Sequence, residues 1–467
     1  MSDKPSTLIM VVENQVREFD SKLLVACCAA ERGCPVIIGS QFFMYLILHH
    51  LPLGVFFAKS MRSVNGMTFK LIKHLGYHIV ACDEEALVRF DSPEYYDWRY
   101  STRTFSTISR FFAWGQDDAQ MYKSYKAYSG APVHITGNPR IDLLRPELRD
   151  IFQPKADALR ARYGNFVLIN TNFSFVNNFV KGLNLIQRDE KGNFLRISRA
   201  GSGLSRKFAE GQANHQQAIY DAFRILLPRL CEWFPDTTFV LRPHPSENHQ
   251  AWREIMAGFD NIDIEHDGNV VPWLMACRCL LHNGCTTAVE AAILETPAIS
   301  YQPVISDIYD YHLPNSLSHR VFNHEQLRAC LADVLNGKIG LIDQQTRDRI
   351  YAKHLASMSG SFAADKIVDI LVQAGYVNDQ PRSRSLIRFV YGWLAMQGRS
   401  YLQRLIMLQP NHRTNMMHQI HQFPHISAEE VNSRIRYFGK RLRRFSNIHA
   451  EMISPFIFRI KRREQAD

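Results

Sequence analysis

The chain has 467 residues, 46% of them hydrophobic and 21% charged, which is the composition of a globular protein with room for two domains. Its net charge of +10 is uneven. Residues 381–467 hold 16 Lys and Arg against 5 Asp and Glu, a balance of +11, so residues 1–380 stand at about −1. The chain starts with polar residues, so we expect no signal peptide. The apolar run at 35–58 is interrupted, so we do not expect it to span a membrane.

The first 150 residues alternate short apolar runs with helical stretches. Strands are predicted at 8–12, 36–39, 54–58, 78–81, 110–113 and 133–136. A helix is predicted over 21–32, where Leu23, Leu24, Cys27 and Ala30 share one face. Strands that alternate with helices are typical of a parallel sheet, so residues 1–150 are predicted to form a Rossmann-like α/β domain.

A charged helical linker at about 145–164 leads into a second α/β unit. Its strands are predicted at 166–170, 238–241, 262–264, 279–281 and 298–301, and its longer helices at 213–233 and 286–294. The polar segment 173–205 is predicted to be a long loop, a feature that is usually functional or mobile. We therefore predict a second Rossmann-like domain at 165–375, with a cleft between the two domains.

Arg242-Pro243-His244-Pro245 follows the apolar strand 238–241. A proline on each side fixes the backbone and holds the imidazole of His244 in one direction. Such a histidine is suited to bind a phosphate oxygen and to stabilise the charge of a leaving nucleotide, with Arg242 on the same group. The alternative is a surface histidine in an ordinary loop.

A second motif, from His282 to Glu290, follows the strand 279–281 and opens a helix. Gly284 permits close backbone approach, while Thr286 and Thr287 are expected as the N-cap and a first-turn hydroxyl. Glu290 is expected either to bind a ribose hydroxyl or to complete a Thr-x-x-Glu capping pattern. If the two motifs lie at adjacent strand ends, they form a phosphate site and predict a nucleotide-linked substrate.

Two polar clusters follow strands in the first half. Asp83, Glu84 and Glu85 form either a solvated loop or, in a cleft, a group whose mutual repulsion raises one pKa and makes it a base. A second cluster follows the first strand and contains Arg17, Glu18 and Asp20. It is expected either to hold an acceptor hydroxyl or to start the next helix with Asp20 as the N-cap.

Residues 376–467 are predicted to form a basic helical tail. Its first helix is expected over 385–408, and Ser427 with Glu430 forms a capping box that opens another. That second helix has an apolar stripe and a basic face; the stripe is Val431, Ile435, Phe438, Leu442 and Phe445. Such a helix either binds anionic lipid or packs back on the body, and the basic end at 457–463 favours the membrane.

These motifs together resemble the signature of a known family. The His-Pro motif, the threonine pair and the acidic triplet resemble bacterial glycosyltransferases of the GT-B fold that use CMP-activated sugars, such as sialyltransferases and Kdo (3-deoxy-manno-octulosonic acid) transferases. The stretches 13–39, 136–142 and 282–301 resemble bacterial surface carbohydrate biosynthesis proteins, a likeness that covers about residues 8–375. His-Pro is also similar to the motif of CDP-glycerol-type polymerases.

The resemblance implies roles for particular residues. In the sialyltransferase pattern two acidic residues precede a glycine and one of them is the base on the acceptor hydroxyl. Here the pair is Glu84-Glu85, with Ala86 in place of the glycine, and Glu85 is the favoured base. The family's hydroxyl pair, usually Ser-Ser or Ser-Thr, corresponds to Thr286-Thr287, and the His-Pro motif places its imidazole on the CMP phosphate. If the sugar is transferred with retention, the acidic triplet supplies a nucleophile instead.

The function that these expectations imply is a cytoplasmic glycosyltransferase, peripheral at the inner membrane, in capsule or lipopolysaccharide biosynthesis. It would transfer Kdo or a related sugar from CMP to a glycan or lipid-linked glycan, without a metal or a cofactor. The anionic membrane surface is the expected partner of the tail, and nucleic acid is not expected. The alternatives are an isomerase like the UDP-N-acetylglucosamine 2-epimerases and a non-catalytic carbohydrate-assembly protein.

Overall fold

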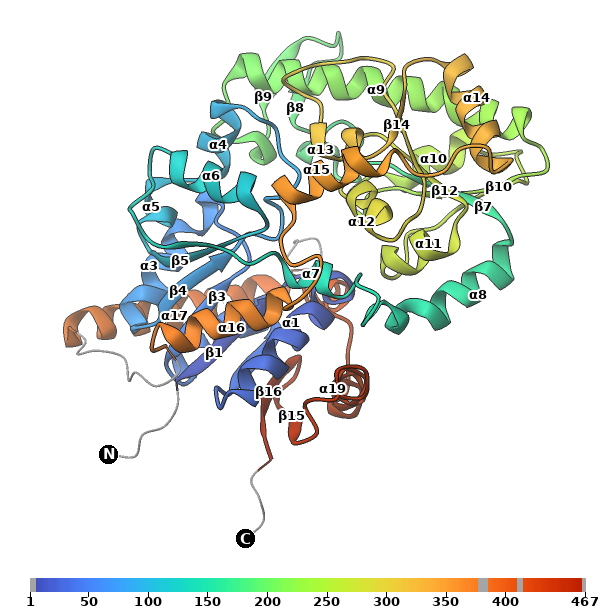
Figure 1. Ribbon diagram of the computed structural model, residues 1–467. Coiled ribbons are helices and arrows are strands. Elements are labelled where there is room, and N and C mark those ends of the chain that lie inside the picture. Colours follow the sequence, from blue (N-terminus) through green and yellow to red (C-terminus); the bar gives the residue numbers. More distant parts are fainter. Residues whose placement is uncertain (1–5, 377–384, 410–414, 464–467) are drawn as a thin grey trace. The chain divides into compact units, whose positions relative to one another are not determined.

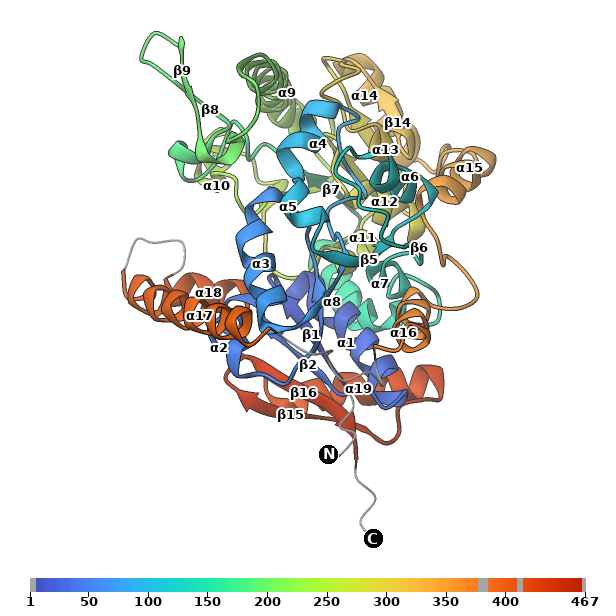
Figure 2. The same ribbon diagram turned by 90° about the vertical axis from the view of Figure 1, so that its left-hand side faces the viewer.

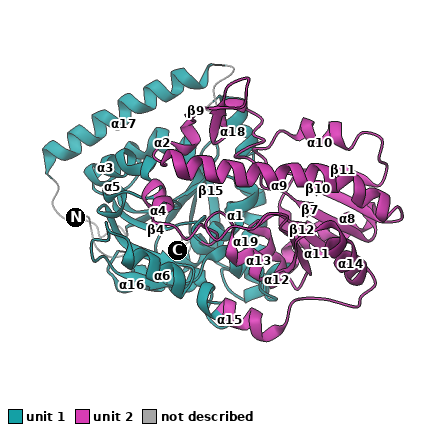
Figure 3. Ribbon diagram, turned by 90° about the horizontal axis from the view of Figure 1, so that it is seen from above, with its two compact units in different colours: residues 1–86, 100–149, 352–467 teal, residues 87–99, 150–351 magenta. Residues whose placement is uncertain are grey.

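The computed structural model describes residues 6–376, 385–409 and 415–463 (Figure 1). The chain forms two compact units (Figure 3). Unit 1 contains residues 1–86, 100–149 and 352–467, and unit 2 contains residues 87–99 and 150–351. This division differs from the predicted one, because residues 352–467 belong to the first unit and residues 87–99 to the second.

Eight strands of the described residues form the sheet of unit 1, in the order β15-β16-β2-β1-β3-β4-β5-β6. They are β1 (Thr7–Val12), β2 (Val36–Ser40), β3 (Gly54–Ala58), β4 (His78–Cys82), β5 (Ile108–Ala113), β6 (Val133–Ile135), β15 (Ile448–Ser454) and β16 (Ile457–Arg462). The first six are parallel, while β15 and β16 join antiparallel beside β2. The parallel strands have the flavodoxin-like order 2-1-3-4-5, extended by β6.

The helices of unit 1 connect and cover this sheet. The longer ones are α1 (Gln15–Glu31), α3 (Gly66–Leu75), α6 (Gln116–Ser124), α16 (Ala363–Gln373), α17 (Leu386–Met407) and α19 (Ala428–Leu442). The shorter ones are α2 (Gln41–Ile47), α5 (Thr102–Phe105), α7 (Pro139–Asp142), α18 (Met416–Gln422) and the 3-10 turns η1 (Leu48–His50) and η2 (Ser63–Asn65). Within the described residues, no helix is both long and apolar enough to cross a membrane.

Six described strands form the parallel sheet of unit 2, in the order β11-β10-β7-β12-β13-β14. They are β7 (Phe166–Asn170), β10 (Thr238–Arg242), β11 (Ile262–Ile264), β12 (Cys279–His282), β13 (Ala298–Tyr301) and β14 (His319–Val321). Numbered along the chain this is the order 3-2-1-4-5-6 of the Rossmann fold. The α/β class with two Rossmann-like units, as a GT-B enzyme requires, is therefore confirmed.

The helices of unit 2 include those that cover both faces of its sheet, and the last of them runs on into unit 1. They are α4 (Pro93–Arg99), α8 (Gln153–Tyr163), α9 (Arg206–Trp233), α10 (His249–Ile255), α11 (Val270–Ala276), α12 (Thr287–Ile293), α13 (His312–Ser316), α14 (His324–Leu335) and α15 (Gln344–His354), with the 3-10 turns η3 (Arg149–Phe152), η4 (Lys181–Leu183) and η5 (Arg199–Gly201). Alternate residues of β7 enter two apolar cores. Val167 and Ile169 pack with α9, α10 and α14, whereas Phe166 and Leu168 pack with α8, α11 and α12. A strand covered on both faces is apolar throughout, which is why its sequence predicts it well.

The prediction of a long loop at 173–205 is wrong. This segment contains a hairpin of β8 (Ile186–Arg188) and β9 (Phe194–Ile197), and it packs with residues of α4 and α9 in one apolar cluster. Phe90 of the inserted segment 87–99 belongs to the same cluster and stacks on Tyr311 with ring centroids 4.4 Å apart. The partners of this segment are distant in the sequence, so local composition gave no sign of them.

The prediction of an entirely helical tail is also wrong at its end. In β16, Ile457, Phe458 and Ile460 are buried, and the basic residues between and after them face the other side. Arg459 and Lys461 pair with Glu451 of β15 at 3.1 and 3.3 Å. The alternation of apolar and basic residues has the period of a strand, and the basic end belongs to a sheet.

Helix α19 has the predicted capping box, but its apolar stripe faces the body of unit 1. Val431, Ile435 and Phe438 are buried, and Arg434 pairs with Asp20 of α1 at 2.6 Å. Of the two interpretations of this helix, the structure therefore matches the one in which it packs back on the body.

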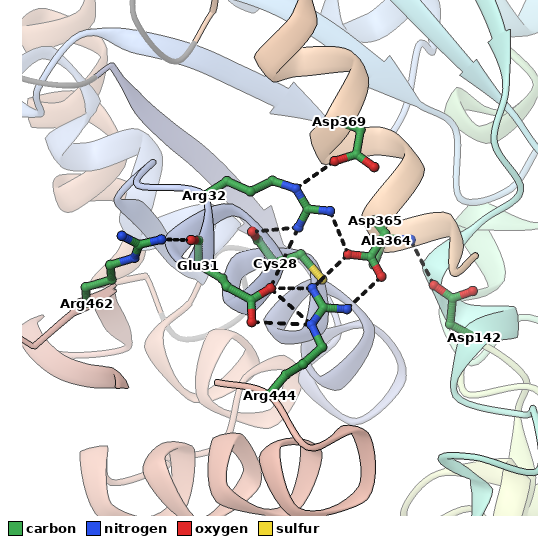
Figure 4. A network of polar contacts seen from close by, with 9 residues as sticks. All are labelled: Cys28, Glu31, Arg32, Asp142, Ala364, Asp365, Asp369, Arg444 and Arg462. Carbon is green, nitrogen blue, oxygen red and sulfur yellow. Dashed lines mark hydrogen bonds and ion pairs between the residues drawn. The ribbon is translucent and has the colours of Figure 1, made fainter. Parts of the chain in front are cut away.

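An ion network joins the C-terminal segment to α1 (Figure 4). Arg444, which follows α19, pairs with Glu31 at 2.5 Å and with Asp365 of α16 at 2.9 Å. Arg32 also pairs with Asp365, at 2.9 Å. Beside them, Asp142 accepts hydrogen bonds from the first two backbone N–H groups of α16, and burial raises the pKa of this carboxyl to about 7. These contacts make residues 352–467 part of unit 1.

Replacing Arg444 with Ala is expected to destabilise the protein by about 2 kcal/mol, because Glu31 and Asp365 lose a shared, partly buried cation. Arg436→Ala removes an exposed pair with Glu429 and is the control, with a loss below about 0.5 kcal/mol. Urea unfolding of both variants measures the difference. Equal losses in the two variants would contradict the role of Arg444.

Candidate functional site

The two motifs lie at the carboxyl edge of the sheet of unit 2. The His244 loop follows β10 and the Gly284 turn follows β12, but the two strands are not adjacent, because β7 lies between them. The expectation of adjacent strand ends is thus corrected. The strand order reverses at β7, and loops that leave in opposite directions at such a point open the crevice where α/β sheets bind ligands.

The end of β7 and the residues that follow it connect the two motifs. Asn170 donates a side-chain hydrogen bond to the Thr287 hydroxyl at 3.1 Å, and the backbone N–H of Asn172 donates to the Asn283 side chain at 2.9 Å. On the other side, the Thr171 hydroxyl donates to Glu247 at 2.9 Å. One short segment therefore fixes the loop after β10 and the turn after β12 in a single arrangement.

Glu247 is the centre of the His244 loop, and the sequence analysis missed it. Its buried carboxylate accepts hydrogen bonds from the Thr171 hydroxyl, from the backbone N–H groups of Phe173 (3.0 Å) and His244 (3.1 Å), and from the Trp252 indole (3.0 Å). Burial raises the pKa of Glu247 above its ordinary value, and these four donors oppose that rise. An acid in a polar loop is usually solvated, so its spacing gave no signal of this role.

His244 is held as a hydrogen-bond donor. Its ring Nδ1 accepts from the backbone N–H of Ser246 at 3.2 Å, and the backbone N–H of His244 donates to Glu247 at 3.1 Å. Because Nδ1 uses its lone pair, the neutral ring carries its proton on Nε2. A half-buried imidazole in this tautomer presents N–H, the group that a phosphate oxygen accepts.

Arg242 has contacts that differ from the expected phosphate contact. Its guanidinium donates to the carbonyl of Asp267 at 2.9 Å and to those of His266 and Gly268 at 3.3 Å, and it lies over the Trp273 ring at 4.7 Å. Burial lowers the pKa of Arg242 to about 10. These contacts shape the loop after β11, beside the His244 loop.

His282 shapes the turn after β12. Its Nδ1 accepts from the N–H groups of Gly284 (2.9 Å) and Cys285 (3.3 Å), and its Nε2 bonds to the Ser318 hydroxyl at 2.8 Å. The backbone N–H groups of Gly284 and Cys285 are therefore directed at the imidazole of His282. Gly284 has φ +86°, and a Cβ there would lie 3.2 Å from the Tyr311 ring, so glycine is favoured at this position.

The remaining predicted residues of the turn are in place at the start of α12. Thr286 is the N-cap, as predicted, but its side chain makes no capping hydrogen bond. Thr287 receives its bond from Asn170, and Glu290 is buried on α12. The Thr-x-x-Glu capping pattern is not formed through Thr286, and the ribose contact of Glu290 stays a prediction.

The carboxyl edge of unit 1 carries a buried ion cluster at its own strand-order reversal, between β1 and β3. Glu18 of α1 pairs with Lys22 at 2.7 Å and with Lys59, after β3, at 2.6 Å, and Lys59 also pairs with Glu13, after β1, at 2.5 Å. Burial raises the pKa of Glu18, but the two ammonium groups outweigh burial and leave it well below its ordinary range. Glu18 is thus committed to this cluster.

The three carboxylates after β4 lie in different environments. Asp83 is fully buried and accepts from the Trp114 indole through its carbonyl at 2.7 Å. Glu84 is buried, and its Oε1 lies 3.8 Å from the Lys22 ammonium, whereas Glu85 is exposed. The charge of Lys22 and the exposure of Glu85 relieve the repulsion expected between the three carboxylates.

The prediction of Asp20 as an N-cap is wrong. Helix α1 begins at Gln15, and its N-cap is Asn14, whose side chain accepts from the backbone N–H of Arg17 at 3.3 Å. The first turn is polar and was not counted as helix, which moved the expected start to a later polar residue. Asp20 pairs with Arg434, and the exposed Arg17 stays a predicted acceptor contact.

Comparison with known proteins is limited to the fold. No protein-family model and no curated protein matches the chain. Solved structures that it resembles include S. aureus MnaA with UDP (13% identity, TM-score 0.48, 80% of this chain and 99% of that one) and wall teichoic acid polymerase TagF with CDPG (11%, 0.49, 80% and 89%). A third is Methanocaldococcus jannaschii UDP-GlcNAc 2-epimerase with UDP-GlcNAc and UDP (14%, 0.47, 79% and 99%).

The stability of unit 2 is expected to fall in acid through His282, because burial lowers its pKa from 6.5 to about 3. The unfolded chain takes up the proton below pH 6.5 and the folded chain does not, so stability is lost as pH falls from 6.5 towards 3. Between pH 7 and pH 5 this amounts to about 2 kcal/mol.

Urea unfolding at both pH values measures this loss. In His282→Gln the imidazole is absent, and the fall in stability is expected to be smaller by that amount. Ser318→Ala keeps the imidazole, so it is expected to lower stability without removing the pH dependence. An unchanged pH dependence in His282→Gln would show that the ring is not held neutral.

Proposed function

We propose that the protein is a metal-independent glycosyltransferase of bacterial surface polysaccharide biosynthesis, in capsule or lipopolysaccharide assembly. It transfers Kdo or a related ulosonic acid from a CMP-activated donor to a glycan or lipid-linked glycan, and it needs no cofactor. The observation that carries this proposal is the orientation of His244, an N–H donor held at the strand-order reversal of unit 2.

The donor half of the reaction is assigned to unit 2. When the bond between the sugar and the phosphate oxygen breaks, CMP leaves with the electron pair and negative charge grows on its phosphate. A donor whose position is fixed beforehand stabilises that charge without reorganising, and Glu247 fixes the backbone of His244 in this way. Thr286 and Thr287 supply hydroxyls at the opposite loop, and Glu290 is assigned to the ribose.

The acceptor half is assigned to the edge of unit 1. The acceptor hydroxyl gives its proton to a carboxylate after β4 as it attacks the sugar. The resemblance favours Glu85, which is exposed. Within the described residues the buried Oε2 of Glu84 has no hydrogen-bond partner, which makes Glu84 the alternative base or an acceptor-binding group.

Calorimetric titration distinguishes the nucleotide. CMP is expected to bind the full chain more tightly than UMP, and His244→Ala is expected to weaken CMP binding by about tenfold, the value of a hydrogen bond to a charged group. His266→Ala removes an imidazole from the neighbouring loop and serves as the control, with unchanged binding. Selective binding of uridine nucleotides would favour the isomerase instead.

Turnover tests the assigned roles. With CMP-Kdo and a lipid-linked acceptor, His244→Ala is expected to lower kcat for CMP release about 100-fold, because the leaving phosphate loses its donor. Glu85→Gln is expected to lower it by at least as much if Glu85 is the base, with Glu84→Gln measured beside it. Wild-type turnover in His244→Ala would refute the role of His244.

A further inference from the structure

Two long stretches of the chain contain no acidic residue. Between Glu31 and Asp83 there is no Asp or Glu in 51 residues, and between Asp379 and Glu429 there is none in 49. In a chain with 45 acidic residues these gaps are conspicuous. The first stretch contains α2, η1 and α3, and the second contains α17 and α18.

The structure brings helices of these two stretches together. Helix α17 packs along α3, α2 and η1, and Figure 2 shows α17 beside α2 and α3. The inner face of α17 is fixed: Met396 is buried, the Ser400 hydroxyl donates to the Leu46 carbonyl at 2.9 Å, and Arg399 donates to the Thr68 hydroxyl at 2.7 Å. Gly392 lies against His74, where a Cβ would come within 2.8 Å of its Cβ.

The outer face of α17 is exposed, and it is apolar along both halves of the helix, with Gln397 and Gly398 exposed between them. The exposed hydrophobic residues, which we call the α17 stripe, are Leu386, Ile387, Val390, Tyr391, Leu394, Tyr401, Leu402, Leu405 and Leu408. Their exposed fractions range from 45% at Val390 to 82% at Ile387, and Leu408 just after the helix is 74% exposed. They are three or four residues apart along each half of the helix and seven apart between Leu394 and Tyr401, a spacing of two turns, so they share one face about 33 Å long.

Basic residues lie beside the α17 stripe. Arg388 and Arg404 are exposed on the helix itself, and Lys70 and Lys73 are exposed on the neighbouring α3. Long basic side chains place their charge at the level of lipid phosphates while their stems cover apolar surface, and tyrosines favour the same interface. Tyr391 and Tyr401 lie in the stripe.

We propose that the α17 stripe lies in the surface of an anionic lipid bilayer. Helix α17 would lie parallel to the membrane, with its leucines and isoleucine among the acyl chains and the four basic residues at the lipid phosphates. The α17 stripe therefore takes the membrane-binding role that the sequence analysis considered for α19, because the apolar side of α19 is buried. The proposal is independent of the sugar and of the nucleotide.

The charge pattern disfavours a second copy of the chain on this face. A symmetric pair through α17 would bring Arg388 and Arg404 of both copies to one interface, and neither α17 nor α3 has a carboxylate to pair with them. An anionic bilayer supplies the missing charge. The strength of binding therefore depends on lipid charge and on ionic strength.

Flotation of the full chain with vesicles tests the proposal without any nucleotide. The chain is expected to bind vesicles of phosphatidylcholine mixed with phosphatidylglycerol, to bind phosphatidylcholine alone much less, and to release at high salt. The double variant Leu394→Asp/Leu402→Asp is expected to lose about tenfold or more in binding, since it adds two charges to the stripe.

The control is Leu183→Asp/Leu195→Asp, which places the same charges on exposed residues of unit 2 and is expected to bind as the wild type does. Equal binding by the α17 variant, or equal binding to neutral and anionic vesicles, would overturn the proposal. A wild-type dimer in light scattering that the α17 variant dissociates would also overturn it, in favour of a second copy. CMP binding by the α17 variant is expected to be unchanged, so a failure here is separate from a failure of the proposed function.

Discussion

A buried carboxylate needs donors on every side, and Glu247 obtains them from three parts of unit 2. Its partners come from the segment after β7, from the loop after β10 and from α10. The loop of His244 cannot move without breaking bonds to a charge that burial makes costly to leave unsatisfied. Glu247 thus fixes the backbone of His244, and the N–H of Ser246 orients its ring for the assigned phosphate contact.

The two units differ in the side chains that line the strand-order reversal of their sheets. Each has a parallel sheet whose strand order reverses, at β7 in unit 2 and between β1 and β3 in unit 1. In unit 2 the reversal is lined by neutral donors and hydroxyls, with His282 held uncharged by burial. In unit 1 it is filled by Glu13, Glu18, Lys22 and Lys59, whose charges compensate one another. The first environment suits a phosphate, and the second suits hydroxyl groups and a carboxylate base.

The features predicted correctly from the sequence are those that a local residue pattern determines. All eleven strands expected in the two sheets are present, because strands covered on both faces are written as apolar runs, and the capping box of Ser427 needs only four residues to be recognised. The features that were not predicted depend on residues that are distant in the sequence. The apolar stripe of α19 could be recognised in the sequence, but its burial follows from contacts with α1 more than 400 residues earlier, as in the pair Arg434–Asp20. Glu247 was missed, and Arg242 was wrongly expected to contact phosphate, for the same reason: their partners lie on other loops. The exposed face of α17 pointed to a membrane only once the structure placed α2 and α3, which also lack acidic residues, beside it.

The central claim is that a cytidine nucleotide binds where β7, β10 and β12 end. Hydrogen–deuterium exchange of the full chain with and without CMP locates the contact directly, because bound ligand slows the exchange of nearby backbone amides. The account predicts protection concentrated in residues 170–173, 243–248 and 283–288. Protection confined to other segments, or none at a saturating concentration of CMP, would contradict it.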